Sequence, residues 1–429
     1  MRFLHTSDWH LGQNLHQFDR HYEHQTFLDW LLTTLVDEAV DALLIAGDVF
    51  DTTNPSSQAQ NLLYRFLAEA KQRLPSLQVV ITAGNHDSPA RLEAPIPLLS
   101  PFAVHVVGQV RWHKNEGHEN AEIQLADLVI PLRDHSGEIA AWCIAIPFLR
   151  PADVAALSTL NTNSDNAADA YQQGVAALYA AAVAYVEARR TPTQAIIALG
   201  HCQVRGGQVS EQSERQLVIW GAEALPSSIF PPALTYIALG HLHLAQRVGG
   251  QEHCRYSGSP LPLSFAEIHY PHQVVCVDVA GAAIEQIRSI AVPRPVALWR
   301  VPEKPAPLPE VIKALNALDT ATLALDQIEN PAKYPYLLAS VKLDQPEPTL
   351  RAEIEAALAD KPVRLARIET TYTLNANTST TTPALSSLDD LQQLAPASFF
   401  ARLYERRFNS ELPEELAAAF AELLNAPAE

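Results

Sequence analysis

Hydrophobic and polar residues follow one another in a repeating order along the first two thirds of the chain. Short apolar runs end in polar turns, and amphipathic segments such as 19–40 separate several of them. Continuous apolar runs of this length are typical of strands covered on both faces, and amphipathic segments predict helices. The runs lie at 42–46, 79–81, 195–199 and 236–239, and a short strand is also predicted at 2–6. The order predicts β-α-β units, with further strands within 104–148, near 255 and at 274–279 completing the sheet.

The pattern changes after about residue 291, where prolines become frequent and mark a domain boundary. The segments beyond it predict a small β-α-β-α-β domain. A stretch rich in Asn, Ser and Thr at 375–383 then predicts a flexible linker, and two amphipathic helices follow it. We therefore divide the chain into a main domain at 1–291, a small domain at 292–374, a linker at 375–386 and a helical pair at 387–429.

Composition narrows the class of protein. A chain of 429 residues that is 48% hydrophobic can bury a large core in two or three domains. Its four cysteines form no C-x-x-C pair, which argues against a zinc–thiolate site and favours a reducing compartment. No signal-like or membrane-spanning apolar stretch is present, so we expect a cytoplasmic protein. The formal net charge of −18 opposes nucleic-acid binding over the whole surface but excludes neither a local basic face nor a bound cation.

Five strand ends carry residue types that bind metals. They supply Asp8 and His10; Asp48 and Asp51; Asn85, His86 and Asp87; His201; and His241 and His243. Because the carboxyl ends of strands in an open α/β sheet line one crevice, we expect these side chains to converge. Imidazoles with carboxylates and an amide suit Mn, Fe or Zn in a hydrolytic site. A shared carboxylate, which we assign to Asp48, can bridge two cations about 3.5–4 Å apart.

Several of these residues have other interpretations. A lone histidine at such a position is more often a hydrogen-bonded loop residue than a ligand. Asp51 is predicted to lie behind the ligands or to accept a hydrogen bond in the turn. Asp87 is predicted to orient His86. Arg91 is either the solvated start of a helix or a residue that faces phosphate.

Taken together and in order, the motifs D-x-H, G-D-x-x-D, G-N-H-D, G-H and G-H-x-H resemble the calcineurin-like metallophosphoesterase superfamily. The longer stretches at 5–12, 84–91 and 236–265 look like its bacterial DNA nuclease subunits, and the resemblance is strong over about 1–293. It implies an α/β fold, a sandwich of two sheets flanked by helices, with a small α/β capping domain and a C-terminal helical pair.

The resemblance also implies a chemistry, namely Mn²⁺-dependent hydrolysis of DNA phosphodiesters by exonuclease and endonuclease action. Two cations would bind a phosphodiester oxygen and lower the pKa of a water. His86, oriented by Asp87, would protonate the leaving 3′-oxygen. Carried over to this chain, the first cation would be held by Asp8, His10, Asp48 and His243, and the second by Asp48, Asn85, His201 and His241.

The partners that the resemblance implies are double-stranded DNA ends and hairpins, in recombination, replication and repair at the nucleoid. The C-terminal helices would bind an SMC-like ABC-type ATPase, and helices of the nuclease domain would form a homodimer. Two alternatives stay open. One is a phosphoprotein phosphatase or small-molecule phosphodiesterase, against which the capping domain and tail argue. The other is a binding scaffold without catalysis, against which the complete ligand set argues.

Overall fold

The computed structural model describes residues 1–113, 122–158, 167–208, 224–320, 323, 325–372, 400, 403–404, 412–413, 416–417 and 420. They fall into two compact units, Met1–Ala297 and Leu298–Glu429, which are described one at a time. The predicted linker at 375–386 and most of the predicted helical pair at 387–429 lie outside the described residues. Among the helices that the structure describes, none is long and apolar enough to cross a membrane.

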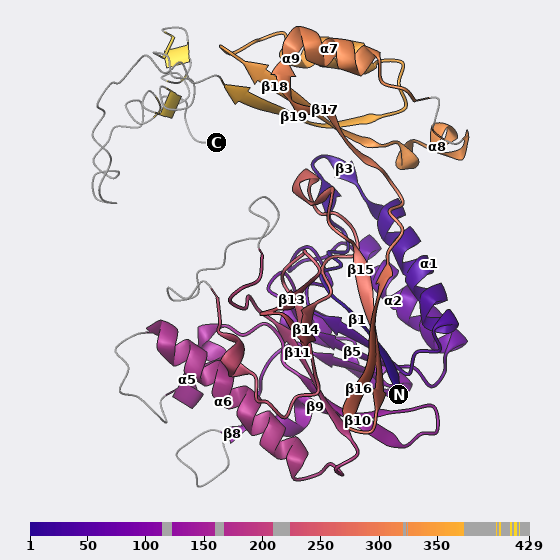
Figure 1. The fold of residues 1–429 in the computed structure, drawn as a ribbon, viewed down its shortest axis with the longest axis vertical. Coiled ribbons are helices and arrows are strands. Elements are labelled where there is room, and N and C mark those ends of the chain that lie inside the picture. Colours follow the sequence, from indigo (N-terminus) through magenta and orange to yellow (C-terminus); the bar gives the residue numbers. More distant parts are fainter. Residues whose placement is uncertain are drawn as a thin grey trace. The chain divides into compact units, whose positions relative to one another are not determined.

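The first unit contains two six-stranded sheets (Figure 1). The first sheet has the order β16 (Ala283–Ala291), β15 (Gln273–Ala280), β1 (Arg2–Thr6), β4 (Ala42–Ala46), β5 (Gln78–Thr82) and β6 (Val104–Val107). Strands β1, β4, β5 and β6 are parallel, and β15 is antiparallel to both of its neighbours. The metal-ligand turns after β1, β4 and β5 therefore lie at one edge of this sheet.

The second sheet has the order β13 (Gln246–Val248), β14 (Gln251–Tyr256), β12 (Tyr236–Gly240), β11 (Ala195–His201), β10 (Ile139–Ala145) and β9 (Val129–Arg133). Its four central strands are parallel, and β9 and β13 are antiparallel edge strands. The prediction of β-α-β units is confirmed, as is the two-sheet sandwich that the resemblance implies, whereas the single sheet expected from the hydrophobic pattern alone is wrong. A strand buried on both faces has the same apolar pattern in either sheet, so the pattern cannot assign it to one of them.

Helices cover the outer faces of both sheets. Helices α1 (His21–Asp37) and α2 (Ser57–Arg73) pack on the first sheet, and α6 (Ala167–Glu187), preceded by α5 (Pro151–Ser158), packs on the second (Figure 1). The alternation along β4 shows this layering, because Leu43 and Ile45 join the core beneath α1 and α2 while Leu44 joins the core that includes the second sheet. The predicted sandwich flanked by helices is thus confirmed.

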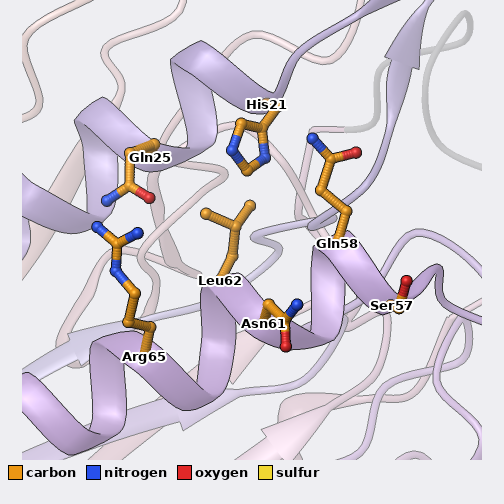
Figure 2. Close-up of a pocket in the computed structure, with 7 residues that line it drawn as sticks. All are labelled: His21, Gln25, Ser57, Gln58, Asn61, Leu62 and Arg65. Carbon is orange, nitrogen blue, oxygen red and sulfur yellow. The ribbon is translucent and has the colours of Figure 1, made fainter.

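Helix α2 begins later than its sequence suggests. Asn54 followed by Pro55 resembles a helix start, but the N-cap is Ser56, whose hydroxyl accepts a hydrogen bond from the Ala59 amide at 3.2 Å. Helices α1 and α2 leave between them a hollow of about 250 Å³ (Figure 2). It is lined by His21, Gln25, Ser57, Gln58, Asn61, Leu62 and Arg65. None of the predicted metal ligands lines this hollow.

Smaller elements connect these layers. They are β2 (Asn14–Leu15), β3 (Phe18–Asp19), α3 (Pro89–Glu93), α4 (Ile96–Leu99), β7 (Trp112–His113), β8 (Glu122–Ile123) and short 3₁₀ turns, among them η5 (Phe265–Glu267). Hairpin β2–β3 and the segment before η5 are tied together, because Arg20 donates to the Pro262 carbonyl at 2.9 Å and Gln13 donates to the Leu263 carbonyl at 3.2 Å.

The second unit is a parallel three-stranded sheet with helices between its strands. Its elements are β17 (Leu298–Pro307), α7 (Leu308–Asn316), α8 (Leu325–Glu329), β18 (Tyr336–Leu343), α9 (Leu350–Leu358) and β19 (Arg364–Tyr372). Helices α7 and α9 bury Val311, Leu315 and Ile354 against β18. In the tail, the rings of Phe400 and Phe420 stack with their centroids 4.1 Å apart.

Candidate metal centre

The turns that carry the predicted ligands come from both sheets and meet in one place. Asp8 and His10 follow β1, Asp48 and Asp51 follow β4, and Asn85, His86 and Asp87 follow β5. His201 ends β11 of the second sheet, and His241 and His243 follow β12. Turns of the two sheets are in direct contact. His201 Nδ1 lies 2.8 Å from the Ala46 carbonyl, and the His241 amide donates to Asp8 at 2.9 Å.

Glycines make this close approach possible. A Cβ at Gly240 would overlap the carbonyl oxygen of Ala46 on the opposite sheet, and a Cβ at Gly84 would overlap the carboxylate of Asp48. Because these neighbours are backbone or a buried carboxylate, no flexible side chain can move aside. The glycines before the ligand residues are therefore required by the contact between the strand ends.

The centre is buried and its backbone is strained. Asp8, His10, Asp48, His201, His241 and His243 are all between 0 and 6% exposed. Four of them adopt positive φ: Asp8 at 54°, His10 at 46°, Asp48 at 47° and His241 at 103°. Positive φ in residues other than glycine is uncommon and concentrates at functional sites, where the surrounding structure holds it in place. The turns are thus shaped to aim ligands inward.

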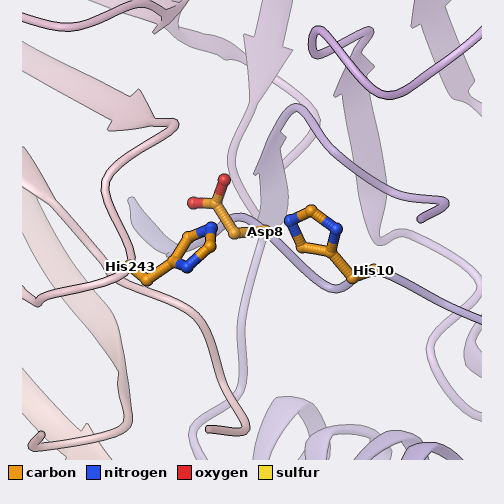
Figure 3. A group of neighbouring side chains, drawn as sticks. All are labelled: Asp8, His10 and His243. Carbon is orange, nitrogen blue, oxygen red and sulfur yellow. The ribbon is translucent and has the colours of Figure 1, made fainter. Parts of the chain in front are cut away.

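Asp8, His10 and His243 form the first cluster, with one ligand atom of each lying within 4.8 Å of the others (Figure 3). The Nδ1 atom of His10 is 3.1 Å from Asp51 Oδ1, while its Nε2 is buried without a hydrogen-bond partner. A buried imidazole nitrogen without a partner is costly unless something binds it. A cation bound by Asp8 and His243 would also bind this Nε2 atom of His10.

The second cluster joins Asp48 and Asn85 to histidines of the second sheet. Asp48 Oδ2 lies 3.3 Å from His201 Nε2, and Asn85 Oδ1 lies 3.0 Å from both His201 Nε2 and His241 Nδ1. Atoms that share a cation at about 2.1 Å are spaced roughly 3 Å apart, so this donor set also fits a divalent ion. Asp48 belongs with His10 and His86 in one group and with Asp8 and His201 in another, as a bridging ligand would.

The electrostatics of the centre follow from burial. Burial alone would raise the pKa of Asp48, but His201, His10 and His86 hold it below its usual range. Burial would likewise lower the pKa of His201, yet the Asp48 carboxylate raises it to about 9. Burial, with His201 nearby, lowers the pKa of His241 to about 3. Asp48 is therefore held in its ionised form inside the centre, and divalent cations bound there would balance its charge.

The predicted contact between Asp87 and His86 is wrong. The Asp87 carboxylate is fully buried and accepts backbone N–H groups from Gly84 at 2.9 Å, Val49 at 3.1 Å and Phe50 at 2.9 Å. His86 Nδ1 instead lies 2.7 Å from the Asp51 carbonyl. Asp87 points into the turn and fastens the loops after β4 and β5 to each other. Burial and the nearby Asp48 carboxylate raise the pKa of Asp87 to about 6, although the three N–H groups act to lower it.

Two further predicted residues, Asp51 and Arg91, and one that was not predicted, Glu267, also have defined positions. Asp51 contacts two of these histidines, since its carboxylate lies against His10 and its carbonyl against His86. Arg91 is exposed on α3, and both of its interpretations stay predictions. Sequence reasoning missed Glu267, which is fully buried with Oε1 2.9 Å from His243 Nδ1. The only signal for it was an acidic residue after an apolar stretch, and that signal does not name a partner.

Comparisons with known proteins identify the family. A model of the calcineurin-like phosphoesterase family matches residues 1–245, and one described as the type 5 capsule protein repressor C-terminal domain matches 292–408. The chain is 41% identical to the SbcD component of the SbcCD nuclease of Rhodobacter capsulatus over 94% of each chain. It is 40% identical to the corresponding Escherichia coli K12 protein over 68% of each chain. Identity to the corresponding Bacillus subtilis protein is 32%, over 65% of this chain and 66% of that one.

The role of Asp87 as a backbone fastener leads to a prediction. Asp87→Ala leaves three buried N–H groups without acceptors, each costing about 1–3 kcal/mol. In chelator, so that cations do not contribute, thermal unfolding should shift downward by at least about 5 °C. Asp134→Ala, which removes an exposed turn acceptor for the Ser136 amide, is the control and should shift it by about 1 °C or less. Equal unfolding temperatures for both variants would contradict the assignment.

Proposed function

The chain belongs to the calcineurin-like phosphoesterase family and, within it, to the SbcD nuclease subunits, and we propose that it hydrolyses DNA phosphodiesters with two divalent cations, Mn²⁺ above all. It is a metal-dependent phosphodiesterase by family. The observation that carries the proposal is the position of Asp48, which lies in one group of possible ligands with His10 and His86 and in another with Asp8 and His201. The alternatives of a phosphoprotein phosphatase, a small-molecule phosphodiesterase or a non-catalytic scaffold become outcomes of the test below.

The two clusters correspond to two sets of ligands. The first cation would be held by Asp8, His10, Asp48 and His243, and the second by Asp48, Asn85, His201 and His241. Bound there, such cations polarise the phosphoryl group and make an attacking water more acidic. The chain keeps the ligands in place, because the Ser7 hydroxyl and the His241 amide donate to Asp8 while the His86 amide donates to Asp48 at 2.8 Å.

His86 has the geometry of a proton donor. Its Nδ1–H donates a hydrogen bond to the Asp51 carbonyl. This contact fixes the ring and leaves Nε2 as the nitrogen that can carry the transferred proton. The ring lies edge-on to His10 with centroids 4.8 Å apart, beside the first cluster. A proton held at Nε2 would pass to the leaving 3′-oxygen as the phosphorus–oxygen bond breaks. Asp87 contributes indirectly through the loop that carries His86.

Two variants separate cation binding from chemistry. Asp48→Asn should weaken both cation sites and abolish manganese-dependent cleavage of double-stranded DNA ends and hairpins, because it removes the shared carboxylate. His86→Gln should leave two cations bound while it slows cleavage by a factor on the order of 10²–10⁴. Cation stoichiometry from isothermal titration and rates on DNA, on a nitrophenyl phosphate and on a phosphopeptide are the measurements.

Each outcome of that experiment has a meaning. Faster turnover of the small phosphates than of DNA would replace a nuclease with a phosphatase, and two bound cations without any hydrolysis would indicate a scaffold. Loss of a cation in His86→Gln would show that His86 is a ligand, as its place in a cluster with His10 and Asp48 allows.

We also propose that the tail binds an SMC-like ATPase, the SbcC component that the relatives' name implies. Phe400 and Phe420 stack on each other, while Leu403 and Leu416 are 49% and 42% exposed. Short amphipathic helices need a surface on which to bury such residues, and a coiled-coil groove supplies one. Such a partner and a DNA substrate would place the protein at the nucleoid.

The tail proposal can be tested with point variants. Leu403→Asp with Leu416→Asp should abolish co-purification with the cognate ATPase, as should deletion of residues 384–429. Manganese-dependent cleavage of short DNA should persist in both. Ile328→Asp, which changes a 39% exposed apolar residue before the tail, is the control and should co-purify as wild type does. Co-purification of the deletion variant would place the ATPase contact elsewhere.

A homodimer through the first unit is the remaining proposal about partners. Residues 94–102 carry no charged side chain, and they present Leu98 at 74% and Phe102 at 59% exposure. On a chain of net charge −18, an uncharged apolar patch is where two copies can meet without repulsion. A two-fold interface also needs one self-complementary patch, which this segment can provide.

Sedimentation tests the dimer. Leu98→Asp with Phe102→Asp should convert a dimer into a monomer at micromolar concentration, because four carboxylates would face one another in a two-fold interface. Val36→Asp, a substitution at a 40% exposed site on α1, should leave the dimer intact. A monomeric wild type, or a dimeric double variant, would remove this patch as the interface.

A further inference from the structure

We propose that Glu267 is a positioning residue for the first cation, acting through His243. This inference rests on the proposed function. Glu267 ends the short turn η5, which begins after Ser264, whose hydroxyl accepts a hydrogen bond from the Ala266 amide at 3.2 Å. The side chain is 0% exposed, and its Oε1 lies 2.9 Å from His243 Nδ1.

The other carboxylate oxygen of Glu267 is also engaged. Oε2 accepts a hydrogen bond from the Leu263 amide at 2.8 Å, so the carboxylate contacts a backbone donor with one oxygen and an imidazole with the other. The Leu263 carbonyl accepts a hydrogen bond from the side chain of Gln13, which lies in the loop after His10. The Ser259 amide donates to the His243 carbonyl at 3.1 Å. Glu267 therefore holds the segment that joins the loops of two ligands.

The chemistry of this contact selects one form of the His243 ring. A carboxylate accepts hydrogen bonds only, so His243 must carry its hydrogen at Nδ1, and its lone pair is then at Nε2. A lone pair at Nε2 is what a cation shared with Asp8 and His10 requires. Metal-bound histidines commonly donate their other nitrogen to a carboxylate, and removing that partner typically weakens metal binding 10–100-fold.

The isosteric amide cannot replace this carboxylate. In Glu267→Gln, an amide oxygen turned toward Leu263 N–H brings the amide NH₂ against His243 Nδ1, which favours hydrogen at Nε2 and blocks the ligand. The opposite rotamer places NH₂ against the Leu263 N–H, where two donors meet. Either arrangement disfavours the form of His243 that binds a cation.

The effect should fall on one cation. His10 and His243 both have carboxylates behind them, Asp51 and Glu267, whereas His201 Nδ1 faces the Ala46 carbonyl. Because the ligand that Glu267 contacts, His243, belongs to the first cluster, the cluster built on Asp48, Asn85 and His201 keeps its donors. A general loosening of the fold would instead weaken both sites together.

The experiment is a titration of the metal-free full chain with Mn²⁺, measured by calorimetry. Glu267→Gln should weaken one of two binding events about 10–100-fold and leave the other within about twofold. Glu93→Gln is the matched control, because Glu93 is also a buried glutamate that accepts a backbone amide, that of Gly108 at 2.8 Å, away from the ligands. It should bind both cations as wild type does. In a His243→Ala background, Glu267→Gln should cause no further loss.

A second measurement needs no folded variant at position 267. Long-range ¹⁵N spectra of the metal-free wild type, with His243 identified by its absence in His243→Ala, should show hydrogen at Nδ1. Hydrogen at Nε2, or unchanged binding of both cations in Glu267→Gln, would overturn the inference. A wild type that binds no cation would instead overturn the proposed function, so the two failures are distinguishable.

Discussion

The architecture depends on bringing buried carboxylates and imidazoles from two sheets into contact. Ionised groups removed from water are strongly unfavourable unless a partner or metal balances them. Here Asp8 and Asp48 are 0 and 2% exposed and face histidines of the opposite sheet. Such a centre is stable as a cation site, because two divalent ions balance the carboxylates and bind the lone pairs of the imidazoles. The structure around the centre keeps this arrangement from relaxing.

Three features hold the strand ends in place. Positive φ in a residue other than glycine costs on the order of 1–3 kcal/mol and persists only where the surroundings enforce it. Asp87 supplies one such restraint by fastening the turns after β4 and β5, and Glu267 supplies another from outside the sheets. The helical layers supply the rest, since α1 and α2 cover the first sheet with a continuous apolar core. Ligand geometry is thus a property of packing as much as of the ligands.

The sequence was informative wherever chemistry and local pattern coincide. The strand at 42–46 has the predicted bounds, because an apolar run that ends in a turn residue is a local signal. The ligand residues could be found because imidazoles and carboxylates after buried strands serve no packing purpose. The hydrophobic pattern alone could not assign the strands to two sheets, since that pairing depends on contacts between residues far apart in the chain; the resemblance supplied it.

Errors at single residues have the same origin. Asp87 was expected to orient its neighbour His86, but adjacent side chains diverge and the carboxylate satisfies three backbone donors from two turns. Ser56 caps α2 although Asn54 and Pro55 carry the stronger local signal. Glu267 lies 24 residues from His243, and no pattern along the chain connects them. Which buried polar group meets which donor is decided by the tertiary fold.

The acidic balance of the chain bears on how a phosphodiester could reach this centre. A net charge of −18 repels a polyanion, and several of the carboxylates that contribute to it lie at the centre. Two divalent cations oppose this repulsion locally, because they bring four positive charges next to the two negative charges of the ligands Asp8 and Asp48. Substrate engagement at the reactive phosphate should therefore be coupled to cation loading, each favouring the other by linkage. The residues that set cation affinity, among them those behind the ligands, then also set how well the phosphate is held.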